Sequence, residues 1–190
     1  MANGQPPKLA LEQVGMISAD DALARARRAV TVAASVPSNL SQEKYDQEVN
    51  AVSAASDVSD WIFPELGEEV RRDLAHEFLE RGKVISQPGH LSFALRQHVQ
   101  PFKVARDIAN ATKHRLTLDD VDVYVTASAI TSELDSHIVG NWIGKAIDPS
   151  TGGRHRLADV AGNLVKFWDE FRPDPVGAVR AYRDKNSAWP

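Results

Sequence analysis

LSFALRQHVQPFKVARDIANATKH, residues 91–114, is the longest stretch of helical periodicity in the chain. Residues at helical spacing along it would share one side of a helix; they are Leu95, Phe102, Ala105, Ile108, Ala109 and Thr112. Pro101 lies inside the stretch, where it removes a backbone hydrogen bond and clashes with the preceding turn. We therefore predict a kink, or a break into helices at 91–99 and 101–114.

The rest of the chain carries more helical patterns, and several have recognisable ends. Ser18 followed by Asp21 is typical of a helix-capping box. Pro37 and Pro64 should end the first two helices, because the residue before a proline avoids helical geometry. We expect helices from Ser18 to about Pro37, from Ser41 to about Phe63, over 65–81 with Gly82 as the stop, and from Leu157 to Pro173.

The periodicity changes after Leu118. VDVYVTASAIT, 121–131, alternates apolar and polar residues and is rich in β-branched side chains, and HIVGNWIGKAI, 137–147, is a second strand candidate. HRLADV, 155–160, is a candidate third strand. We therefore predict a mainly α fold of the α+β kind. It is an up-and-down helical bundle with a small antiparallel β-sheet of two or three strands, at about 121–160, before a C-terminal helix.

A chain of 190 residues with 43% hydrophobic residues can bury one core, so a single domain is expected. We assign 1–17 to a flexible arm, 18–174 to the helical-bundle domain with a β insertion at 119–156, and 175–190 to a C-terminal tail. The large aromatic residues sit at helical or alternating positions, which favours packing in the core; they are Trp61, Phe63, Trp142, Phe167, Trp168 and Phe171.

Net charge, cysteine content and the motifs that are absent limit the classes of function that the sequence allows. The formal net charge is −4, so RNA binding would need a local basic patch rather than a global attraction. The chain contains no cysteine, which rules out disulfides and thiolate chemistry and favours a reducing compartment. No signal-peptide or membrane-span pattern occurs, so we expect a cytoplasmic protein without a membrane partner. Without a phosphate loop or an HExxH motif, we expect no cofactor and no metal.

The candidate site lies in RDIANATKHRL, residues 106–116. On a helical wheel, the polar side chains share a stripe opposite the apolar side; they are Lys103, Asp107, Asn110 and His114, flanked by Arg106 and Lys113. The stripe could be a solvated face, a helix-to-helix network with Asp57 or Asp60 or across a dimer, or a reactive site. Asp and Asn are mediocre helix formers, and a histidine beside a carboxylate suits acid–base chemistry near neutral pH.

Three short segments carry a resemblance to a known family: DWIFPEL at 60–66, the D-x-x-N-x-x-K-H ending of 107–114, and FWDEF at 167–171. Together they resemble poorly characterised bacterial proteins of the HEPN superfamily. The resemblance implies a bundle of four or five helices, usually dimeric. Many members are metal-independent RNases of toxin or phage-defence systems that use an R-x4-6-H motif, and other members are not catalytic.

The resemblance implies roles for the candidate residues. His114 would act as general acid or base on a ribose 2′-hydroxyl, Arg106 or Lys113 would stabilise the transition state, and Asp107 and Asn110 would orient the histidine or the substrate. However, seven residues separate Arg106 from His114, one more than the motif allows.

Arg71 and His76 do fit the motif, but roughly one such match is expected by chance, so both are read as surface residues of an amphipathic helix. We therefore expect a HEPN-like protein from a stress, toxin or defence system with candidate RNase activity. The alternative is a non-catalytic homodimeric interaction or structural module. The expected partners are a second copy of the chain, RNA, or a protein such as an antitoxin.

Overall fold

The computed structural model describes residues 18–37, 41–79, 82–114, 124–130, 141–147 and 154–185. Most of these residues are helical, which confirms the predicted mainly helical fold. Within the described ranges, no helix combines the length and the apolar character needed to cross a membrane. The helices are α2 (Ala19–Ser35), α3 (Ser41–Ile62), the 3-10 turn η1 (Phe63–Glu65), α4 (Glu68–Phe78), α5 (Pro88–His98), α6 (Gln100–His114), α7 (Leu157–Phe171) and α8 (Pro175–Lys185).

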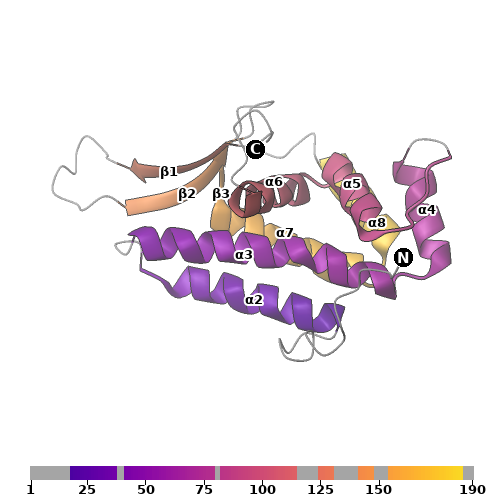
Figure 1. The fold of residues 1–190 in the computed structure, drawn as a ribbon, viewed down its shortest axis with the longest axis horizontal. Helices are drawn as coiled ribbons and strands as arrows, with labels where there is room; N and C mark the ends of the chain where they lie inside the picture. Colours follow the sequence, from indigo (N-terminus) through magenta and orange to yellow (C-terminus); the bar gives the residue numbers. More distant parts are fainter. Residues whose placement is uncertain are drawn as a thin grey trace.

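Three strands stand between α6 and α7 in the chain: β1 (Tyr124–Ile130), β2 (Asn141–Ile147) and β3 (Arg154–Arg156). Both strand pairs are antiparallel, and the order in the sheet is β1-β2-β3. Figure 1 shows the strands at the opposite end of the molecule from α4. The surfaces of α4 and α5 are therefore remote from the sheet.

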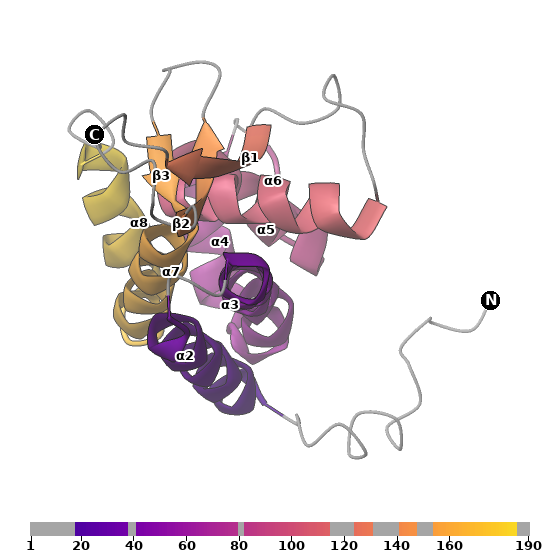
Figure 2. The same ribbon diagram turned by 90° about the vertical axis from the view of Figure 1, so that its left-hand side faces the viewer.

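Helix α7 is the centre of the packing. It contacts α2, α3 and α6, and Figure 2 shows α2, α3 and α7 grouped below the sheet. The aromatic residues of α7 are fully buried, and Trp168 meets the ring of Phe102 in α6 edge-on at 5.8 Å between centroids. The Trp168 indole Nε1 also donates a hydrogen bond to the Ala55 carbonyl oxygen of α3, at 2.8 Å. One aromatic residue thus links three helices.

The expected core is found where side chains are described. Phe63 is buried and Trp61 is partly buried, alongside the fully buried aromatics of α7. The side chain of Trp142 lies outside the described residues. Burial of several large rings in one cluster accounts for much of the apolar surface that a helical domain of this size must remove from water.

Several helix ends lie where local sequence places them. The Ser18 hydroxyl accepts a hydrogen bond from the Asp21 backbone amide at 3.2 Å, as the capping box predicted. The predicted break near Pro101 is also confirmed: α5 ends at His98 and α6 begins at Gln100, so that Pro101 occupies the first turn of α6. A proline is tolerated there because that backbone position needs no hydrogen-bond donor.

Other boundaries differ from the prediction. The helix expected over 65–81 is shorter, and α5 begins at Pro88, three residues before the expected start at Leu91. The prediction that 175–190 form a tail is wrong for 175–185, which form α8. Asp174 caps this helix by accepting a hydrogen bond from the Gly177 amide at 2.9 Å, and Pro175 suits its first turn. The predicted arm at 1–17 lies outside the described residues.

Helix α8 is fixed to the core by Tyr182, which gives a prediction for alkaline pH. Its ring packs edge-on against Phe167, and burial, together with the charge of Glu170, raises the pKa of Tyr182 to about 12. An unfolded tyrosine titrates near pH 10, so the contribution of neutral Tyr182 to stability is complete below about pH 10 and is lost as the pH rises toward 12. The pKa of Tyr45 is raised as well, so we expect a spectrophotometric titration to show a tyrosine step near pH 12 that Tyr182→Phe removes. A Tyr182→Phe variant that keeps the late step would contradict this assignment.

Candidate functional site

All five candidate residues predicted from the sequence belong to α6, but the structure describes only two of their side chains, Arg106 and Asp107. The side chains of Asn110, Lys113 and His114 lie outside the described residues. The surroundings of the candidate site are therefore described through the contacts of Arg106 and Asp107.

Asp107 faces α5. Its side chain is 2% exposed, and its Oδ1 lies 2.5 Å from Nη2 of Arg96. The break at Val99 folds α5 back against α6, which brings Arg96 over a carboxylate eleven residues later in the chain. Of the alternatives considered from the sequence, a solvated face does not fit Asp107, because its side chain is buried. A helical wheel shows which residues share a face but not which neighbouring helix covers that face.

Arg106 faces α3. Its Nη1 lies 3.8 Å from Asp57 Oδ1 and 3.9 Å from Asp60 Oδ2, and its side chain is 22% exposed. The helix-to-helix alternative considered from the sequence named these same two aspartates, and these ion pairs match it. Consecutive residues of α6 thus tie this helix to α3 on one side and to α5 on the other.

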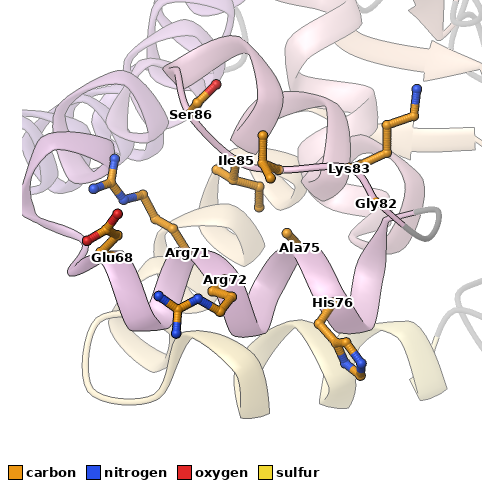
Figure 3. A pocket seen from close by; sticks show the side chains of 10 residues that line it. Glu68, Arg71, Arg72, Ala75, His76, Gly82, Lys83, Ile85 and Ser86 are labelled. Carbon is orange, nitrogen blue, oxygen red and sulfur yellow. The ribbon is translucent and has the colours of Figure 1, made fainter.

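Arg71 and His76, the pair that fits R-x4-6-H, both line one cavity beside α4, but their side chains do not converge. They lie on α4, where a separation of five positions rotates the second side chain by about 140°. Figure 3 shows Arg71 directed toward the segment 83–86 and His76 directed to the other side of α4. His76 is exposed, as the interpretation of the pair as surface residues expected, but Arg71 is partly buried.

A cavity of about 790 Å³ lies between α4 and the segment 83–86. The segment returns along α4 because Gly82 adopts a φ of +84°, a conformation that residues with a side chain rarely adopt. The polar lining includes Arg71, Arg72 and Lys83 with a single carboxylate, Glu68, among the described lining residues. The sequence analysis missed this cavity, because neither the Arg71–Arg72 pair nor Lys83 alone indicates that the chain reverses between them.

Arg71 is held in place within this cavity but is not neutralised. Its guanidinium carbon lies 5.2 Å from the centre of the Phe63 ring, a cation–π contact. Its Nε is buried and has no hydrogen-bond partner in the part of the chain that the structure describes.

Arg180 of α8, unlike Arg71, is paired with a carboxylate. It donates two hydrogen bonds to Glu77, at 2.8 and 2.5 Å, and these lower the pKa of the Glu77 carboxyl.

A second cavity, of about 680 Å³, adjoins the first and shares Gly82, Lys83 and Val84 with its lining. It is lined by Lys83, Val84 and Phe93, with His90 and Gln97 as hydrogen-bonding groups. Val84 is 64% exposed and Phe93 is 56% exposed, and Val32 is the other exposed large apolar residue among the described residues. We call the continuous surface formed by Arg71, Arg72, Lys83, Val84 and Phe93 the α4–α5 surface.

The described residues contain no group of three or more histidine, aspartate or glutamate side chains arranged to hold a metal ion. Comparisons of the chain with protein-family models, with curated proteins and with solved structures find no match. The resemblance to the HEPN superfamily therefore stays a prediction from the three sequence segments.

Proposed function

We propose that the protein is a non-catalytic interaction module with a HEPN-like helical architecture. The observation that carries the proposal is the exposure of both Val84 and Phe93 in the lining of one cavity. Exposed apolar side chains that gather at one place are typical of protein–protein contact sites, whereas isolated ones need no explanation. The α4–α5 surface is therefore the proposed contact site.

The packing of α6 favours this role over RNA cleavage. A residue that orients a substrate must reach it, but the Asp107 carboxylate is buried beneath Arg96. An arginine that stabilises a transition state must offer its charge to the reacting phosphate, but Arg106 lies between two carboxylates of α3. Both residues are better suited to holding helices together. The rival hypothesis is a metal-independent RNase with His114 as the acid–base residue.

The chemistry of the surface bears on the predicted partners. In a symmetric dimer the same patch of both copies would meet, so Arg71, Arg72 and Lys83 would approach their own counterparts. Like charges facing each other oppose association. We therefore propose that a different protein, of the kind that an antitoxin represents, binds the α4–α5 surface, and that a homodimer would use another face.

RNA cleavage distinguishes the two hypotheses. We measure the cleavage rate of labelled single-stranded RNA with and without EDTA. We expect the wild-type protein and a His114→Ala variant to give the same rate as buffer without protein. A His76→Ala variant is the matched control, because it tests the residue that fits the R-x4-6-H spacing. EDTA-resistant cleavage that His114→Ala abolishes at unchanged thermal stability would overturn the proposal.

A further inference from the structure

Among the described residues, no carboxylate is paired with the cations of the α4–α5 surface, whereas several other arginines of the protein are paired. Arg27, Arg172 and Arg180 each bind a carboxylate on another helix or turn. In the part of the chain that the structure describes, no ion pair is formed by Arg71, Arg72 or Lys83, and all three line the same cavity. Three cations against one carboxylate make this cavity attractive to an anionic partner.

The fixed position of Arg71 strengthens that attraction. Its stacking on Phe63 restricts the side chain before any ligand arrives, so less conformational entropy is lost on binding. Its guanidinium has also given up hydration at the buried Nε without gaining a hydrogen bond there in the described structure. A ligand carboxylate that paired with the exposed guanidinium nitrogens of Arg71 would therefore meet a positive charge that is already held in position.

The spacing of the charges indicates the shape of the ligand. Figure 3 shows the charged ends of Arg71 and Lys83 at opposite ends of the segment 83–86, rather than converging on one point. A single phosphate or carboxylate could not contact both at once. The arrangement suits an elongated ligand that carries several separate negative charges.

The apolar part of the surface favours a peptide over a nucleic acid. Lys83 lines both cavities, so the cations adjoin the exposed side chains of Val84 and Phe93. Single-stranded nucleic acids are usually held by several aromatic side chains on which bases stack, and here the exposed apolar pair includes one aromatic and one aliphatic residue.

We infer that the α4–α5 surface binds an acidic peptide segment of a partner protein, with carboxylates on Arg71, Arg72 and Lys83 and a large apolar side chain against Val84 and Phe93. The inference rests on the proposed interaction role and names the partner's chemistry. An aspartate- or glutamate-rich segment with a leucine or phenylalanine between the acids has this chemistry.

The inference can be tested by fluorescence anisotropy with the full chain and a fluorescein-labelled peptide in which pairs of glutamate alternate with leucine and phenylalanine. Two reference peptides carry glutamine in place of glutamate, or serine in place of leucine and phenylalanine. We expect each reference peptide to bind about tenfold more weakly, and the binding of the acidic peptide to weaken with added salt.

Matched variants locate the contact. Arg72→Glu with Lys83→Glu should weaken binding of the acidic peptide about tenfold or more, and Phe93→Ser should weaken it about fivefold. Arg28→Glu and Val32→Ser are the controls, since they make the same kinds of change at exposed positions of α2. Both controls should bind within about twofold of the wild type. Thermal melting by circular dichroism checks that each variant is folded.

Three results would overturn the inference: equal binding of the glutamine peptide, wild-type affinity in the Arg72/Lys83 and Phe93 variants, or tighter binding of a labelled oligouridylate that these variants abolish. The last result would assign the surface to RNA. These failures differ from failure of the proposed function, which would appear as RNA cleavage dependent on His114. Loss of peptide binding without RNA cleavage refutes the inference alone.

Discussion

Replacing Trp168 by alanine is expected to lower the free energy of unfolding by about 4 kcal/mol. The side chain is fully buried and packs against the rings of Phe102, Phe167 and Phe171. Its removal would leave a large cavity between α3, α6 and α7. It would also remove the indole donor that satisfies the buried Ala55 carbonyl. Few other single substitutions in the described residues combine both losses.

Urea unfolding followed by circular dichroism measures this effect, and Trp168→Phe separates its two parts. Phenylalanine keeps a ring in the cluster but cannot donate to Ala55, so we expect it to cost about 2 kcal/mol. An equal cost for both variants would show that ring packing contributes little here. Such a result would contradict the view that Trp168 organises the core.

Replacing Asp107 by alanine is expected to destabilise the protein by about 3 kcal/mol, because removing one member of a buried ion pair leaves the other charge poorly compensated. The effect should lie at the lower end of the usual range, since the Arg96 side chain is 36% exposed and keeps some hydration. The same unfolding measurement reports it. Arg27→Ala is the matched control, because its partner Asp169 and Arg27 itself are both exposed, and we expect a cost below about 1 kcal/mol.

The double variant Arg96→Met with Asp107→Leu tests whether the unpaired charge of Arg96 causes the loss of stability in Asp107→Ala. Replacing both charges with apolar groups of similar length should recover most of the loss, because neither charge is then left behind. If the double variant is as unstable as Asp107→Ala, contacts of Asp107 other than the Arg96 pair carry the effect. If Asp107→Ala is as stable as the wild type, the ion pair does not hold α6 against α5.

The helices could be predicted from the sequence where periodicity and local end signals agree. Ser18 and Pro101 each act through bonds within a few residues, so their effects on α2 and on the α5–α6 break are visible in a linear sequence. Helix α8 was missed, although Asp174 followed by Pro175 is a helix-start signal. Its short, polar-rich pattern is a helix largely because Val179 and Tyr182 dock on the core.

The candidate sites depend on which helix covers which face, and that information is not local. Periodicity placed Asp107 opposite the apolar side of its own helix, but α5 packs over it and makes this side part of the interior as well. Likewise, the α4–α5 surface exists because the segment 83–86 runs back along α4 after the positive φ of Gly82, so that Lys83 lines the same cavity as Arg71 and Arg72. No spacing rule in a linear sequence encodes such a reversal, whereas the Arg71–His76 spacing satisfied a motif although the two side chains do not converge.

The docking of α8 has a consequence for the order in which parts of the protein fold during translation. Helix α8 contacts α4 and α5, and Arg180 reaches Glu77, which lies 103 positions earlier in the chain. Helices α2 and α3 can pair as soon as both have been synthesised, since they are adjacent in sequence. The support beneath α4 and α5 is complete only after α8 has been synthesised. In a nascent chain, α2 and α3 can thus pair long before the end of the molecule that carries the α4–α5 surface is fully braced.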